Sequence, residues 1–121
     1  MYTQKAIAYE RIIEALQRSG EFSLRNFLSL VECGEYHDDQ ARNMKLYLLA
    51  NQAQTEIAQS INLGRPVLPK TTLDLMAKYQ DESNDDLCRN WLERLEYNHH
   101  ITEKYIELLA AAAKQDLQSD A

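Results

Sequence analysis

The chain has 121 residues, of which 45% are hydrophobic and 26% charged, a composition that is ordinary for a globular protein and argues against disorder over its whole length. Only three Gly and two Pro are present, so the chain lacks the turn residues that an all-β protein needs about every ten positions. The net charge is −6, and residues 74–121 carry this excess, with five basic against eleven acidic side chains. Such an acidic part repels nucleic acid and anionic membrane surfaces.

The cysteines and the first residues indicate where the protein resides. Cys33 and Cys88 form no metal or redox motif, so we expect two reduced thiols. The first ten residues show no basic region followed by an apolar one, so no signal peptide is evident. No apolar run is long enough to span a bilayer. These features predict a cytoplasmic protein with no membrane segment.

The first third of the chain predicts two helices with a break at Ser19-Gly20. Residues 2–18 have the apolar spacing of an amphipathic helix, and Gly20 is a typical helix terminator. Ser23 is a favourable N-cap for a short second helix that Gly34 would end. The residues expected on the inner face of this second helix are Leu24, Phe27, Leu28 and Val31.

A third helix of about 22 residues is predicted from Asp38 or Asp39 to about Asn62, with Gly64 just after it. Its apolar residues cover more than one side, which is typical of a helix with neighbours on two sides. The residues concerned are Met44, Leu46, Leu48, Leu49, Ala53, Ile57 and Ile61. We therefore expect this helix to be the central one of the fold.

Two prolines, Pro66 and Pro69, exclude a continuous helix over residues 65–70. This stretch is expected to be an extended crossover. A fourth helix should begin with Thr71 or Thr72 as its N-cap. The residues expected on its inner face are Leu73, Met76 and Tyr79.

The C-terminal part predicts one long helix over residues 84–114. Ser83, within a polar turn over residues 81–84, is the expected N-cap. The tail after Ala113 loses the pattern and is expected to fray. Residues at alternating spacings of four and three form a helical seam, namely Cys88, Leu92, Leu95, His99, Thr102, Ile106, Leu109 and Ala113. The poor helix propensity of residues 98–102 leaves a helical hairpin as the alternative.

These elements predict a single all-α domain over residues 1–121, a bundle of five to six helices with a long central helix and a long C-terminal helix or hairpin. It comprises N-terminal helices (1–64), the crossover (65–70) and acidic C-terminal helices (71–121). Each half alone is too small for a good core, so both are expected to share one.

The sharpest candidate for a metal site is the pair Glu96 and His99. Three positions apart on a helix, they have the E-x-x-H geometry of carboxylate-bridged di-iron bundles. Such a site needs a second E-x-x-H and further carboxylates, and the only complement is Glu32, Glu35 and His37. Because Glu35 and His37 do not have helical spacing, we predict no metal site.

Catalytic motifs are missing from the sequence. It has no Gly-rich phosphate loop, no G-x-S-x-G and no C-x-x-C. A pair of Cys33 and His37 is opposed by the carboxylates of Glu32 and Glu35, which disfavour a thiolate. We therefore predict that the protein is not an enzyme, with no catalytic residue and no cofactor.

The alternative hypothesis is a DNA-binding regulator with a helix-turn-helix over residues 24–45 and an acidic dimerisation half. Its second helix would offer only Arg42, Asn43 and Lys45 to DNA. The acidic residues before it would face the phosphates, and no basic stripe supports it. We therefore expect no binding to nucleic acid.

The leading hypothesis is a non-enzymatic protein-interaction module that forms a homodimer, such as an adaptor, a small subunit or an immunity- or anti-defence-type inhibitor. Its partner would be another protein, whose identity the sequence does not reveal. A second stripe with Trp91 and Tyr105 runs beside the seam of the last helix, and aromatic residues are enriched at interfaces. The predicted interface is Trp91, Leu95, His99, Thr102 and Tyr105.

Overall fold

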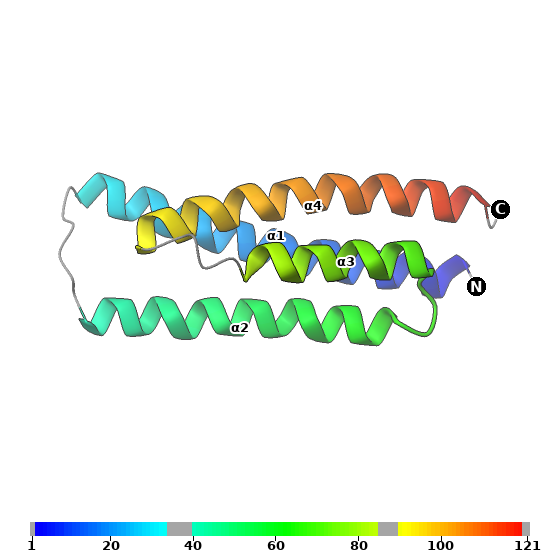
Figure 1. The fold of residues 1–121 in the computed structure, drawn as a ribbon, viewed down its shortest axis with the longest axis horizontal. Coiled ribbons are helices and arrows are strands. Elements are labelled where there is room, and N and C mark those ends of the chain that lie inside the picture. The colour runs from blue at the N-terminus through cyan, green and yellow to red at the C-terminus, as the bar shows by residue number, and fades with distance from the viewer. Residues whose placement is uncertain (1, 34–39, 85–89, 120–121) are drawn as a thin grey trace.

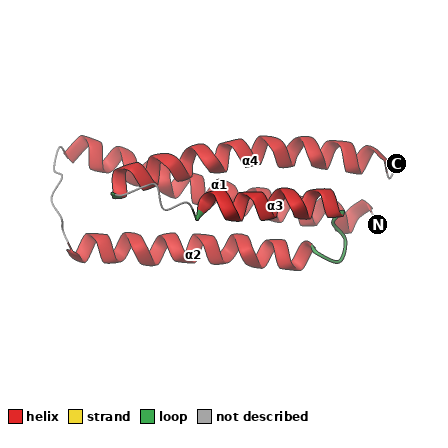
Figure 2. Cartoon of the chain, viewed as in Figure 1, coloured by secondary structure: helices red, strands yellow, loops and turns green. Residues whose placement is uncertain are grey.

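Four helices make up the regular structure that the computed structural model describes, over residues 2–33, 40–84 and 90–119. They are α1 (Tyr2–Cys33), α2 (Gln40–Gly64), α3 (Lys70–Ser83) and α4 (Trp91–Ser119). These residues include no strand (Figure 2). The prediction of one all-α helical domain is confirmed, and the predicted number of five to six helices is wrong.

The helices lie alongside one another in a bundle (Figure 1). The start of α1, the end of α4 and all of α3 lie towards one end, while the end of α1 and the start of α2 lie at the other. α1 packs along both α4 and α2, and α3 packs along α4. The central helix is therefore α1, and the prediction that residues 40–62 form the centre is wrong. α2 leaves several large apolar side chains exposed instead of burying them between two neighbours.

α1 does not break at Ser19-Gly20, where the sequence predicted the end of a first helix. Gly20 is buried in the middle of α1, and a Cβ atom added there would lie 2.6 Å from Oγ1 of Thr102 in α4. The glycine therefore allows two helices to approach closely and does not terminate one. Ser23, predicted as an N-cap, is also buried inside α1.

A group of polar side chains joins α1 and α4 beside this close approach. Asn98 Nδ2 donates to Ser23 Oγ at 2.6 Å and lies 3.1 Å from Ser19 Oγ. Thr102 Oγ1 donates to the carbonyl oxygens of Asn98 and His99 in its own helix, at 2.9 and 3.0 Å. The polar side chains of Asn98 and Thr102 thus have hydrogen-bond partners inside the bundle. α4 continues without a break through residues 98–102, which confirms the long helix over the hairpin.

The main hydrophobic core lies in the half of the bundle that contains α3. Three large aromatic residues, Tyr9, Tyr79 and Tyr105, are at most 2% exposed, and the rings of Tyr79 and Tyr105 meet edge to face at 5.4 Å. The other large residues of this core are Ile12, Leu16, Ile57, Ile61, Leu68, Met76, Ile101 and Leu109. Of the residues predicted inside the fourth helix, Met76 and Tyr79 are buried and Leu73 is half-buried.

The proline-containing connection is shorter than predicted, because Lys70 already belongs to α3. The predicted cap by Thr71 or Thr72 is wrong. Pro69 occupies the N-cap position, and its carbonyl oxygen accepts hydrogen bonds from the backbone N–H groups of Thr72 and Leu73, both at 3.1 Å. The hydroxyl of Thr72 is thereby left for a contact with another helix.

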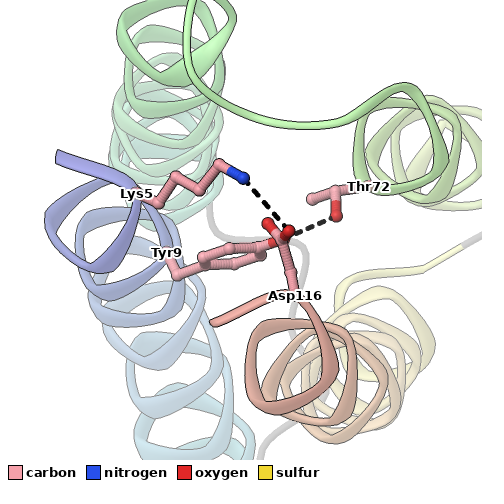
Figure 3. A network of polar contacts seen from close by, with 4 residues as sticks. All are labelled: Lys5, Tyr9, Thr72 and Asp116. Carbon is pink, nitrogen blue, oxygen red and sulfur yellow. Dashed lines mark hydrogen bonds and ion pairs between the residues drawn. The ribbon is translucent and has the colours of Figure 1, made fainter. Parts of the chain in front are cut away.

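A polar network ties α1, α3 and α4 together at this end of the bundle (Figure 3). The hydroxyl of Tyr9 donates to Asp116 Oδ2 at 2.9 Å and lies 2.8 Å from Thr72 Oγ1. Because Tyr9 has a single hydroxyl proton, Thr72 is the donor in the second contact. Lys5 Nζ forms an ion pair with Asp116 Oδ1 at 3.2 Å. The prediction that the chain frays after Ala113 is wrong, because Asp116 holds the last turns of α4 against α1.

We expect Gly20→Ala to destabilise the fold by about 1–3 kcal/mol, because the new methyl group would overlap the Thr102 hydroxyl. At a helix position open to solvent, the same change stabilises by up to about 1 kcal/mol. Urea unfolding of Gly20→Ala, Thr102→Ala and the double variant measures the coupling. Thr102→Ala should rescue Gly20→Ala because it removes the hydroxyl. Thr102→Val should not, because it puts a methyl group in the position of the hydroxyl. Additive effects in the first cycle would contradict the close approach.

The buried tyrosines should make the protein sensitive to alkaline pH. Burial raises the pKa of Tyr9 and of Tyr105 to about 12 from an ordinary value of 10.0, and it also raises the pKa of Tyr79. A raised pKa means that folding favours the neutral phenol, so this stability is complete below pH 10 and is lost between pH 10 and 12.

Urea unfolding at pH 8, 10 and 11 measures this loss. Tyr9→Phe should be less stable at pH 8 by about 1–2 kcal/mol, because Asp116 and Thr72 lose a partner. Its stability should then fall less between pH 10 and 11 than that of the wild type. The matched variant Tyr47→Phe, which removes a hydroxyl at an exposed position, is the control. An equal decline in all three proteins would contradict the assignment to Tyr9.

Candidate interaction site

The only tryptophan of the chain, Trp91, is the first residue of α4, and the residue before it caps the helix. Asn90 precedes the helix, and its Oδ1 accepts a hydrogen bond from the backbone N–H of Glu93 at 2.8 Å. Its Nδ2 donates to Glu93 Oε1 at 3.2 Å, so the side chains of the two residues are also joined. The predicted cap, Ser83, is the last residue of α3 and donates to the carbonyl oxygen of Gln80 at 3.1 Å. α4 therefore begins at Trp91.

Two of the four helices fall short at the end of the bundle where α1 finishes and α2 begins. α3 stops at Ser83 and α4 starts at Trp91, while α1 and α2 extend further (Figure 1). We call residues 24–32 of α1 and 41–51 of α2 the open end. α4 still accompanies α1 over part of this end, since Leu24 and Phe27 line a cleft with Glu96, His99 and His100 of α4.

Exposed apolar side chains collect at the open end. Seven of the ten large hydrophobic residues that are exposed in the described chain lie there. On α1 they are Leu24, Leu28 and Val31, and on α2 they are Met44, Tyr47, Leu48 and Leu49. Leu24, Leu28 and Val31 are spaced by four and three, so they form one stripe, as do Met44, Tyr47 and Leu48. Each helix therefore carries its own apolar stripe. Leu24 of α1 borders a cleft beside His99 and His100 of α4, whereas Tyr47 of α2 lies beside Trp91.

A hollow of about 260 Å³ lies next to the open end, where α3 stops. Four aromatic residues line it, namely Phe22, Tyr47, Trp91 and Tyr97. Uncharged amides and hydroxyls fill much of the remaining wall, and they are Ser19, Ser23, Asn51, Gln54, Ser83, Asn84 and Asn98. Arg94 is the charged residue of the lining, and its guanidinium lies 5.4 Å from the centre of the Trp91 ring.

The polar lining of the hollow is uncharged apart from Arg94. Its described residues include no carboxylate, thiol or imidazole, and its hydroxyl groups belong to serine and tyrosine side chains. Asn98 is engaged with Ser19 and Ser23, and Gln54 Nε2 donates to the hydroxyl of Tyr79 at 3.2 Å. The half-buried Trp91 and the exposed Tyr47 present aromatic surface to whatever enters.

The five residues predicted as an interface share one face of α4, but it is the inner face. Leu95, Thr102 and Tyr105 are buried within the fold, each at most 2% exposed. Trp91 is half-buried at the hollow. His99 is half-buried in a separate cleft with Leu24 and Phe27, and its Nε2 lies 3.4 Å from Glu103. Of the five, Trp91 and His99 remain accessible to a partner.

The seam of the last helix packs within the chain itself. Leu95, Thr102 and Leu109 are buried, and Leu92, Ile106 and Ala113 are half-buried. The seam residue Cys88 lies outside the described residues. The polar middle of the seam contacts α1 of the same molecule, so it does not by itself require a second one.

Glu96 and His99 line the same cleft, together with His100. Glu96 is exposed and pairs with His100 at 4.0 Å, while His99 pairs with Glu103. Within the described residues, no three His, Cys, Asp or Glu side chains are grouped to hold a metal ion. Glu35 and His37, two of the three residues of the predicted complement, lie outside those residues, as does the side chain of Cys33.

The segment considered as a helix-turn-helix has a different geometry. Residues 24–33 are the end of α1, and α1 and α2 lie alongside each other instead of forming the open corner of that motif (Figure 1). The acidic residues Glu35, Asp38 and Asp39 lie outside the described residues. None of the described helices has the length and apolar character needed to cross a membrane.

The sequence pattern predicts that the apolar residues of the open end are buried, whereas the structure exposes them. Leu24, Leu28 and Val31 have the spacing of a buried stripe, and Met44 and Leu48 were counted toward a central helix. The sequence does contain a sign that some of these residues are exposed, because the apolar residues of 40–62 spread over more sides than one neighbouring helix covers.

No protein-family model, curated protein or solved structure matches this chain.

We expect Asn90→Ala to loosen the first turn of α4 and to destabilise the protein by about 1 kcal/mol. Because Trp91 is the only tryptophan, acrylamide quenching of its fluorescence reports this turn directly. Quenching should increase in Asn90→Ala and stay near the wild-type level in Asn90→Ser, which keeps an oxygen acceptor for the N–H of Glu93. Equal quenching in Asn90→Ala and the wild type would contradict the capping role.

Proposed function

We propose that this protein is a non-enzymatic protein-interaction module that binds another protein through the open end of its bundle. The observation that carries the proposal is the gathering of seven exposed large apolar side chains at one end. Large apolar side chains that are exposed together in one region mark interaction sites, whereas single ones scattered over a surface are ordinary. A cytoplasmic location is part of the proposal.

The hollow beside the open end supports this assignment. Interface hot spots favour tryptophan, tyrosine and arginine in places that a partner can cover. Trp91, Tyr47 and Arg94 supply these three residue types around one depression. A side chain of the partner that entered the hollow would be surrounded by aromatic rings and uncharged amides, which cost less to desolvate than charged groups.

The acidic surplus of the chain has a separate role in this proposal. It belongs to residues 74–121, whereas the charged side chains of the open end are Arg25, Glu32, Arg42 and Lys45. A solvated acidic surface keeps the protein soluble and discourages nonspecific contacts elsewhere. No observation favours DNA binding as a second function.

Site-specific photo-crosslinking tests the proposal. A benzophenone amino acid replaces Leu48 at the open end, or Leu108 on α4 as a matched control, since both leucines are exposed. The protein is expressed in the cells that produce it and irradiated. We expect a protein adduct from position 48 and none of comparable yield from position 108. No adduct at 48, or equal yields from both positions, would contradict an interface at the open end.

A further inference from the structure

We infer that the segment of the partner that binds at the hollow is acidic. It inserts one large apolar side chain between Tyr47 and Trp91 and pairs a neighbouring carboxylate with Arg94. This inference rests on the proposed function and names the chemistry of its partner. The partner contacts α2 and the first turns of α4, and the separate apolar stripe of α1 takes no part in this contact.

The first argument is that Arg94 has no carboxylate partner among the described residues. Its side chain is exposed, and its guanidinium rests on Trp91 at 5.4 Å from the centre of the ring. The described lining of the hollow contains no Asp or Glu. A planar guanidinium that stacks on an aromatic ring still presents N–H groups along its edge, and these match the two oxygens of a carboxylate. The hollow therefore offers a place for one negative charge.

The second argument is the size of the hollow. Pockets that enclose a small-molecule ligand measure about 300–1,000 Å³. The hollow measures about 260 Å³ and has aromatic walls from Phe22, Tyr47, Trp91 and Tyr97. It therefore suits a single large side chain of a protein better than a whole cofactor, and an apolar or aromatic side chain gains the most contact with these rings.

The apolar stripe of α2 extends this site along the helix. Tyr47 lines the hollow and lies on the same stripe as Met44 and Leu48, and all three side chains are more than half exposed. Asn51, one turn further, is exposed and also lines the hollow. A segment held in the hollow can therefore cover a row of uncharged side chains on α2, which cost less to desolvate than charged ones.

The third argument is the charge of this surface. Residues 40–55 of α2 carry two basic side chains, Arg42 and Lys45, and no acidic one, and Arg94 adds a positive charge at the hollow. The chain as a whole has a net charge of −6. An acidic segment is therefore attracted to this surface and repelled by the acidic surplus elsewhere. Residues 34–39 and 85–89 lie outside the described ranges and do not enter this argument.

Selection of peptides on the purified full chain tests the inference. A library of random short peptides displayed on phage is selected against the immobilised wild type. We expect the enriched peptides to carry Asp or Glu beside a large apolar residue. Enriched peptides without tryptophan are then synthesised, and their affinity is measured through the fluorescence of Trp91, the only tryptophan of the chain.

Variants of Arg94 test the ion pair with the synthetic peptides. Arg94→Gln should weaken their binding about tenfold, because a charge-assisted contact is lost. Arg94→Lys should weaken it less, because lysine keeps the charge but not the planar group. The matched control Arg11→Gln removes an exposed arginine outside the open end and should leave the affinity unchanged, although it alters the net charge equally.

Three results would overturn the inference: no enriched peptide, enriched peptides without an acidic surplus, or equal affinities of Arg94→Gln and the wild type. Circular dichroism checks that each variant is folded. The photo-adduct at position 48 separates the two proposals. If the adduct forms while the peptide test fails, the interaction module stands without an acidic partner. If no adduct forms, the interaction module itself is contradicted.

Discussion

The close approach of α1 and α4 at Gly20 and Thr102 is the constraint on which the rest of the structure depends. With no Cβ at Gly20, the Thr102 hydroxyl can lie against the backbone of α1. The hydrogen bonds from Asn98 to Ser19 and Ser23 then set the register of the two helices. This register brings Asp116 opposite Lys5 and Tyr9, where the network of Figure 3 adds α3 through Thr72. A polar contact in the middle of the bundle thus orders its terminal half.

The same register leaves the opposite half incomplete. α3 has 14 residues, whereas α1 has 32 and α2 has 25, so α3 cannot follow the other helices to the far end. The capping of α4 by Asn90 fixes where its first turn begins. Large apolar side chains of α1 and α2 are exposed at this end. The helix lengths determine where the open end lies, and the leucine, valine, methionine and tyrosine residues of α1 and α2 make it apolar.

This division assigns stability and interaction to different parts of one small domain. The terminal half holds the buried tyrosines and the main core, and the proposed interface lies outside that core. A substitution such as Leu48→Glu at a 60% exposed position has little folded packing to disturb. Binding and folding can therefore be varied independently, which makes the proposed interface separable from stability in experiment.

The sequence by itself determined the helical class, the break at the two prolines, the limits of α2 and the continuity of α4 through residues 98–102. Local spacing, proline geometry and propensity act within a few residues, so they can be read from the chain. Only the tertiary structure decided that Gly20 is a contact point, that Ser23 and Thr72 bond across helices, and that Asp116 extends α4. It also decided that Leu24 and Met44 are exposed whereas Leu95 and Tyr105 are buried. An apolar stripe has the same spacing whether or not a neighbouring helix covers it, because coverage depends on where other helices end.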